Sequence, residues 1–351
     1  MNSSDNAVMS LRIFKEEYDS VRKHGAGLID LSPRGRIRVS GTEAVTFLNG
    51  LITNDMKTLG ENTWMPAVFP NVQGRLIAAV RVVRLPDDEK SPAFLIDTEE
   101  ATHEKVLKAI ERFTLAGDFK VFDLTSQTSL ISVQGKDAAE IISAGLSIDV
   151  TSLSKNGVLN SEWNGHSLTV VHATHTAEDG FDFIISTEGA SSLKEALLGS
   201  GARLIAPATF ETLRIEAGVP SFGRDMDETN VVSETNLDDS ISFTKGCYVG
   251  QEIIARIKYR GHVAKKLSGL VLEGDVDLGS HNLVKRDDKE IGRITSFNYS
   301  PTLERTIALG YVRFEHTSPG TKLVVTGDGV EAKATVTELP FVRGSWYSEG
   351  K

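Results

Sequence analysis

The sequence predicts an α+β protein with a separate small β-barrel or sandwich at its C-terminal end. Helix-like and strand-like segments mix without strict βαβ alternation over the first 265 residues, which favours mostly antiparallel sheets. From about Gly269 onward, short strand-like segments are separated by Gly, Asp or Pro. A chain of 351 residues is long enough for two or three domains, so we expect an α+β region over 1–265 and a β-domain over 266–351.

The first half of the α+β region follows from hydrophobic periodicity and turn residues. Apolar side chains at helical spacing begin just after Thr42, which is a plausible helix cap. The residues Asn71–Gly74 mark a turn between two strands. In chain order we expect a helix from Ser10 to near Gly27, a strand at 35–41, a helix at 42–52, two strands within 64–85, a strand at 92–98 and an amphipathic helix at 99–115.

The same mixture then recurs, and the pattern changes only at the proposed domain boundary. Strands are predicted at 123–135, 166–174 and 181–187, and helices at 136–146 and 189–201. The later strands are expected at 268–275, 281–288, 290–300, 305–314, 321–327 and 330–339.

Composition excludes several classes of function. A net charge of -10 argues against wrapping duplex nucleic acid, because such binding depends on neutralising phosphates. One cysteine cannot form an internal disulfide, which fits a reducing compartment, and no apolar run approaches the ~20 residues of a membrane span. No phosphate-binding glycine loop is present. We therefore expect a cytoplasmic protein, and a monomer.

No metal site is predicted. His166, His172 and His175 lie close in the sequence, but their spacing does not repeat a ligand pattern, so we interpret them as histidines exposed on strands. The acidic stretch 223–240 is best interpreted as a solvated loop for most of its carboxylates.

The single cysteine, Cys247, lies in the stretch FTKGCYVGQEIIARIKYRGHVAKKL. A buried structural role is usual for a lone cysteine. Here the flanking glycines favour a turn that exposes the side chain, and Lys245 with the cations downstream would favour the thiolate. Local sequence leaves both roles open. The basic residues that follow are explained by solvated strand faces or by a polyanionic ligand; they are Arg256, Lys258, Arg260, Lys265 and Lys266.

The octapeptide KGCYVGQE, residues 245–252, resembles the K-G-C-[FY]-x-G-Q-E motif of the YgfZ family at every position. Members of that family are folate-dependent proteins of iron–sulfur cluster assembly and repair. Most of the chain is also similar to the larger superfamily of the glycine cleavage T-protein, an aminomethyltransferase. The resemblance implies a ring of three subdomains around a central hole that binds tetrahydrofolate. The similar segments are 37–55, 175–186, 213–228 and 291–312.

The resemblance also implies which residues contact folate. Asp182 and Arg214 occupy the positions of the family's folate-binding glutamate and arginine, and His175 stands where the family has a tyrosine. A carboxylate accepts paired N–H bonds from a pterin, and arginine offers a planar set of donors. Asn54, in the first similar segment, belongs to the expected folate-binding set. Charge alone adds Arg256, because the basic run could hold the glutamate tail of the folate.

One departure from the family pattern decides which function we expect. The segment NVQGRLIAA resembles the T-protein's N-x-x-G-G-V-I-D-D, so that Ala78 and Ala79 replace two aspartates. Alanine cannot act as a general base, and we expect no aminomethyltransferase activity. The leading hypothesis is a tetrahydrofolate-binding protein that supports iron–sulfur client or assembly proteins, with Cys247 and Lys245 as its working residues.

Two alternatives remain open at this point. The first is a folate-dependent one-carbon transferase or demethylase whose carboxylate comes from elsewhere, for example from Glu178 or Asp225. The second is a binding module that uses the ring only as a docking scaffold.

Overall fold

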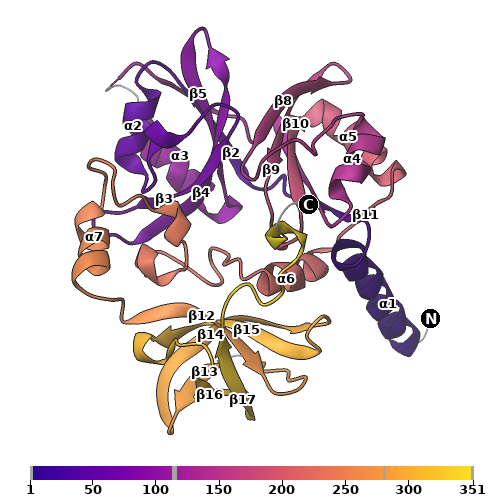
Figure 1. Ribbon diagram of the computed structural model, residues 1–351, viewed down its shortest axis with the longest axis vertical. Coiled ribbons are helices and arrows are strands. Elements are labelled where there is room, and N and C mark those ends of the chain that lie inside the picture. Colours follow the sequence, from indigo (N-terminus) through magenta and orange to yellow (C-terminus); the bar gives the residue numbers. More distant parts are fainter. Residues whose placement is uncertain (1–2, 113–116, 280–281, 349–351) are drawn as a thin grey trace.

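The chain folds into two α+β subdomains and a closed six-stranded β-barrel, which confirms the predicted fold class (Figure 1). The structure is a computed structural model that describes residues 3–112, 117–279 and 282–348. The two α+β subdomains lie beside one another, and the barrel lies across one end of both (Figure 1).

The first subdomain contains a five-stranded antiparallel sheet with the order β3-β4-β5-β2-β6. Two helices cover one face, and their apolar side chains join those of the sheet in a core that includes Leu48, Phe69 and Val106. Its elements are β2 (Gly35–Ser40), α2 (Ala44–Leu51), β3 (Trp64–Pro70), β4 (Leu76–Asp88), β5 (Ser91–Thr98), α3 (His103–Glu111) and β6 (Lys120–Asp123).

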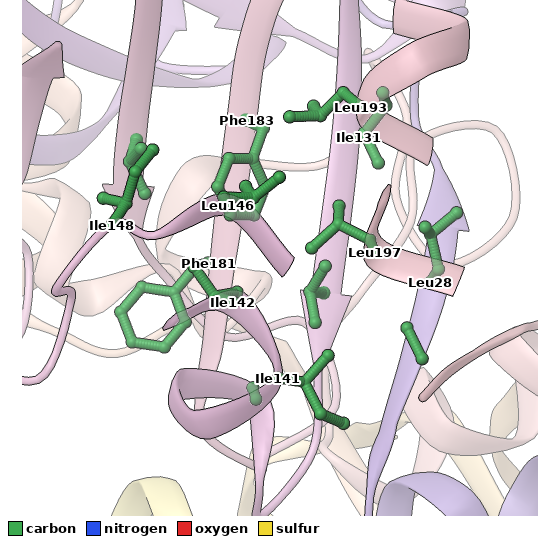
Figure 2. Close-up of a cluster of buried hydrophobic side chains, with 14 of the residues drawn as sticks. Leu28, Ile131, Ile141, Ile142, Leu146, Ile148, Phe181, Phe183, Leu193 and Leu197 are labelled. Atoms are coloured by element: carbon green, nitrogen blue, oxygen red, sulfur yellow. The ribbon is translucent and has the colours of Figure 1, made fainter. Parts of the chain in front are cut away.

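The second subdomain contains a six-stranded sheet with the order β11-β1-β7-β10-β9-β8. Only the pairing of β1 with β11 is parallel. Figure 2 shows part of the core between this sheet and its helices, which includes Leu146 and Leu197 from the helices and Phe181 and Phe183 from β10. Its elements are β1 (Ala26–Asp30), β7 (Thr128–Gln134), α4 (Ala138–Leu146), β8 (Val158–Trp163), β9 (His166–His172), β10 (Gly180–Ser186), α5 (Thr187–Gly199) and β11 (Ala202–Leu204).

Two helices join the subdomains to the barrel. The long α1 (Ser3–Arg22) packs against α6 (Pro207–Glu216), where Arg22 Nη2 lies 2.7 Å from Glu216 Oε2 in a buried ion pair. Helix α6 in turn contacts the outer face of the barrel through Ile215. Short 3-10 helices lie at Met56–Thr58, Glu100–Thr102, Val232–Glu234, Asp238–Ser240, Phe314–His316 and Ser345–Tyr347.

The barrel closes in the order β12-β15-β14-β13-β16-β17 around its own apolar core. After its last strand the chain returns to the α+β region. There Val342 N donates to Glu216 O over 3.1 Å, and Ser345 N donates to Glu178 Oε2 over 2.7 Å. The strands are β12 (Lys265–Leu272), β13 (Leu283–Arg286), β14 (Lys289–Ser300), β15 (Arg305–Arg313), β16 (Lys322–Gly327) and β17 (Val330–Thr337).

Several local predictions are wrong or fall outside the described residues. Of the basic residues after Cys247, Arg256, Lys258 and Arg260 lie on a helix, α7 (Gln251–Arg260), and not on a strand face, whereas Lys265 and Lys266 lie on the first barrel strand. Thr42 does not cap α2, because its hydroxyl donates to Asp118 Oδ2 over 2.6 Å. The last residues of the helix expected at 99–115, the first residue of the strand expected at 281–288 and residues 349–351 lie outside the described residues. No described helix is both long and apolar enough to cross a membrane.

Candidate functional site

A cavity of about 830 Å³ lies between the two sheets and α6. Strand β4, the loop between β1 and β2, and the loop between β9 and β10 provide much of its wall. Aromatic side chains on this wall are Trp64, His175 and Phe210. The volume is that of a site for a drug-sized organic molecule.

Asp182 lies behind the cavity wall and not on it. It is fully buried on β10, and its Oδ2 is 2.5 Å from Arg81 Nη1 and 2.9 Å from His175 Nε2. Burial alone would raise the pKa of Asp182, but His175 and Arg81 hold it well below its usual range. Arg81 and His175 line the cavity, so the carboxylate is screened from it by these two side chains.

Arg81 also joins a second buried carboxylate. Its Nε donates to Asp97 Oδ2 over 2.6 Å, and Arg34 donates to both oxygens of Asp97 over 2.8 and 3.0 Å. Burial alone would lower the pKa of Arg81, but Asp97 and Asp182 raise it above its ordinary value. Guanidinium and carboxylate groups therefore alternate from Arg34 through Asp97 and Arg81 to Asp182, and the ring of His175 lies at the end of this row.

The two alanines that replace the family's aspartates face opposite ways. Ala78 is fully buried in the core of the first subdomain, beside Phe69 and Val80. Ala79 lines the cavity, as does Arg81 two residues later on the same face of β4. Only position 79 could therefore present a carboxylate to a ligand, and in this chain it presents a methyl group.

Arg214 lines the cavity, but each of its five N–H groups already has an acceptor. Nε and Nη2 donate to the two oxygens of Glu211 over 2.7 and 2.6 Å. Nη1 donates to Asp225 Oδ2 and to Val219 O, and Nη2 also donates to Ser296 Oγ. In this arrangement Arg214 holds α6, the 219–225 loop and the barrel together.

The carboxylates suggested as replacement bases are likewise engaged in the structure. Glu178 accepts from Arg22 over 3.1 Å and from both the backbone and side chain of Ser345. Asp225 is buried and accepts from Arg214 and from Thr295 Oγ1. Neither residue lines the cavity.

Lys245 stabilises the end of α2. Its ammonium group is buried and donates to the carbonyl oxygens of Asn49, Ile52 and Asn54 over 2.7, 2.9 and 2.7 Å. A cation at a helix C-terminus satisfies carbonyls that have no partner within the helix. Burial lowers the pKa of Lys245 to about 8. With all three N–H donors in use, Lys245 is a structural residue in this conformation.

The neighbours of Cys247 are also held in place. Tyr248 is buried, Val249 N donates to Gly50 O over 3.1 Å, and Gly250 adopts a φ of 76°. A Cβ at Gly250 would lie 2.3 Å from Asn71 O, so the close approach of the two loops requires glycine. Cys247 itself is exposed, with a free thiol, and it does not line the central cavity.

Two further predicted residues lie away from the cavity wall. The amide of Asn54 donates to Pro66 O over 2.9 Å and to Asp239 O over 3.2 Å, so it connects β3 to the 3-10 helix Asp238–Ser240. Arg256 is exposed on α7. Neither is among the residues that line the cavity.

Arg34, Arg81 and Asp97 were not among the predicted site residues. Partners in this row are up to 101 positions apart in the chain, so no local spacing signals them. A single arginine at a strand position that faces inward, two residues after Ala79, was the only available sign.

His172 is not the exposed histidine that we predicted. It is buried against Phe181, with ring centroids 4.6 Å apart, and its Nε2 lies 2.6 Å from Asp179 Oδ1. Within residues 3–112, 117–279 and 282–348, no three His, Cys, Asp or Glu side chains gather in a group that could hold a metal ion.

Known proteins resemble this chain over nearly its whole length. The family model of the GCVT N-terminal domain matches residues 8–245, and that of the glycine cleavage T-protein C-terminal barrel domain matches residues 265–343. An aminomethyltransferase of Thermotoga neapolitana is 30% identical over 94% of this chain and 90% of its own length. A probable aminomethyltransferase of Natronomonas pharaonis is 33% identical over 93% and 90%, respectively.

Two further comparisons extend this picture. A putative chloroplastic transferase of Arabidopsis thaliana is 28% identical over 97% of this chain and 76% of its own length. The crystal structure of the glycine cleavage system aminomethyltransferase T from Bartonella henselae superimposes with a TM-score of 0.86 at 22% identity, covering 94% of this chain and 90% of that one. The matched domains and these relatives show that the chain belongs to the glycine cleavage T-protein family.

Proposed function

We propose that the protein binds a reduced folate in the central cavity and supports the assembly or repair of iron–sulfur clusters in client enzymes. Membership of the T-protein family supports a folate ligand. The cavity of about 830 Å³ has the size for such a molecule, and Trp64, His175 and Phe210 offer flat rings beside which a pterin would lie. We also propose that the protein is cytoplasmic and monomeric.

The proposal excludes aminomethyl transfer by the family's usual carboxylate. Of Ala78 and Ala79, which replace the family's two aspartates, only Ala79 faces the cavity, and alanine has no titratable group. Glu178 and Asp225 are held in buried ion pairs with Arg22 and Arg214. Neither Glu178 nor Asp225 is therefore available as a general base for a folate bound in the cavity.

One observation carries the role of the thiol: Cys247 is exposed in a loop whose other key residues are committed to structure. Lys245 caps α2, Tyr248 is buried, and Gly250 fits against Asn71. The loop thus fixes the backbone on both sides of a side chain that makes no contribution to the core. Iron–sulfur clusters are held by cysteine thiolates, so an exposed thiol can contribute to a cluster or react with a partner's cysteine.

Complementation tests the role of Cys247. In a strain lacking this protein, Cys247→Ser should fail to restore iron–sulfur enzyme activity, although the purified variant should melt at the wild-type temperature and bind tetrahydrofolate equally well. Full restoration by Cys247→Ser would refute the role of the thiol. Tetrahydrofolate should raise the melting temperature of the wild type, because a ligand that binds only the folded state stabilises it.

A second function is favoured by the relatives. Two similar proteins that align over at least 93% of this chain are named aminomethyltransferase or probable aminomethyltransferase. A folate-dependent one-carbon transferase would form methylene-tetrahydrofolate from tetrahydrofolate and an aminomethylated carrier thiol, with release of ammonia and the free thiol. A demethylase would form it from a methylated amine only with an added two-electron acceptor, and would release the demethylated amine. Detection of that product with purified protein would support this function over the first.

A further inference from the structure

The cavity wall presents guanidinium groups, and the carboxylates that neutralise them lie behind it. Arg34 and Arg81 line the cavity, with side chains 21% and 11% exposed. Asp97 and Asp182 are fully buried and do not line it. A ligand that reaches this part of the wall therefore meets N–H donors first.

Both guanidinium groups retain donors that no described residue accepts. Arg81 uses Nε for Asp97 and Nη1 for Asp182, and its Nη2 makes no hydrogen bond within the described residues. Arg34 uses Nε and Nη2 for Asp97, and its Nη1 is likewise without an acceptor there. Arg214, on the same cavity, has every donor engaged. Among these three arginines of the cavity wall, Arg34 and Arg81 therefore hold the donors that no described residue accepts.

Arg81 cannot turn away to accommodate a different ligand group. Asp97 and Asp182 hold it from two sides, and its Cζ lies 5.6 Å from the centroid of the Trp64 ring. The same two carboxylates keep its guanidinium charged. A planar cation held in this way is a fixed donor, with Trp64 as a flat surface beside it.

We propose that Arg81, assisted by Arg34, is a specificity-determining residue that selects a ring carrying a carbonyl acceptor and rejects the same ring carrying an amino group. This inference rests on the folate ligand of the proposed function. Folates carry a carbonyl oxygen at position 4 of the pterin, and their 4-amino analogues carry a donor there. A site whose fixed groups are donors pairs with the first and leaves two donors facing each other with the second.

A comparison of the affinities for the two ligands tests this inference. Tetrahydrofolate and its 4-amino analogue should be titrated calorimetrically into the wild type, Arg81→Lys and Arg34→Gln. The wild type should prefer tetrahydrofolate by at least about tenfold, since sites built around a hydrogen bond discriminate strongly. Arg81→Lys keeps the charge between Asp97 and Asp182 but loses the planar set of donors, and its preference should fall below about threefold.

Two further variants complete the test: Arg34→Gln covers the case in which Arg81→Lys does not fold, and Arg84→Lys is a control. Arg34→Gln leaves Asp97 paired with Arg81, and it should fold and show a reduced preference even if Arg81→Lys does not fold. Arg84→Lys is the matched control, because Arg84 also lies on β4 and is 11% exposed but does not line the cavity. Its preference should equal that of the wild type.

The possible failures are distinguishable. Equal affinity of the wild type for the two compounds, or a preference unchanged in both Arg81→Lys and Arg34→Gln, would overturn this inference and leave the folate proposal intact. Binding of neither compound by the wild type would refute the folate proposal itself, and this inference with it.

Discussion

His172 and Asp179 are joined by a hydrogen bond of 2.6 Å, and the other ring nitrogen of His172 lies within 3.0 Å of the carbonyl oxygens of Leu153 and Ser154. Both ring nitrogens therefore face acceptors, and only the imidazolium can donate from both. Burial alone would lower the pKa of His172, but Asp179 and the two carbonyl groups raise it above its ordinary value.

Stability should consequently decline with rising pH in a window set by His172. A raised pKa in the folded state means that the contribution is fully present below about pH 6.5, the unfolded value, and is lost as the pH rises through the folded pKa. Urea unfolding between pH 5.5 and 9 should show this decline in the wild type. His172→Phe keeps the stacked ring and should remove the decline; an unchanged profile in this variant would assign it to other groups.

Lys245 and Cys247 should separate into a structural and a functional residue. Lys245→Met removes the donor for three carbonyl oxygens at the end of α2 and should lower the free energy of unfolding by about 2–4 kcal/mol. Cys247→Ser should change it by less than about 0.5 kcal/mol, because the side chain is exposed. Urea unfolding measures both. Wild-type stability of Lys245→Met would return Lys245 to the list of candidate catalytic residues.

Arg214 should matter mainly for stability. Arg214→Met leaves Asp225 buried without its cation and should lower the free energy of unfolding by about 3–5 kcal/mol. The control is Arg224→Met, whose guanidinium also contacts Glu211 but is 63% exposed and should contribute less than about 1 kcal/mol. A stable Arg214→Met protein that no longer binds tetrahydrofolate would instead support the ligand contact implied by the family resemblance.

The opposite orientation of the two alanines on β4 is open to a direct test. Ala78→Asp places a carboxylate in an apolar core and should lower the free energy of unfolding by about 3 kcal/mol or more. Ala79→Asp places it on the cavity wall beside Arg81, where the cost should be about 1 kcal/mol or less. Thermal melts of the two purified variants give the comparison, and equal destabilisation would contradict the assignment of faces.

The helices, strands and turns were predictable because each depends on a pattern of neighbouring residues. The two helices predicted at 136–146 and 189–201 correspond to α4 and α5, and the turn at Asn71–Gly74 separates β3 from β4. Each depends on residues a few positions apart. The error at α7 has a local cause as well: its cations Arg256, Lys258 and Arg260 form one basic run with two lysines of β12, and this run obscured a helix whose buried face contributes Ile254.

The cavity wall was less predictable, for a physical reason. The family resemblance pointed to Asp182, but whether its carboxylate faces a ligand depends on Arg81, which is 101 positions away. Likewise, Lys245 next to Cys247 in the chain suggested an influence on the thiol, whereas its side chain extends to the carbonyl groups of α2. Sequence proximity gives the position of a backbone and leaves the partner of a long charged side chain undetermined.

The segment after β17 attaches the barrel to the α+β region a second time. The barrel is connected to the α+β region at its start, after α7, and again at its end, where Trp346 N donates to Ala177 O over 3.2 Å. Attachment at two separate points holds the barrel against the α+β region, and no described barrel residue lines the cavity. Because Ser296 of the barrel also accepts a hydrogen bond from Arg214, contacts within the chain hold α6 in place. The cavity is therefore preorganised, and association loses little free energy to ordering its walls.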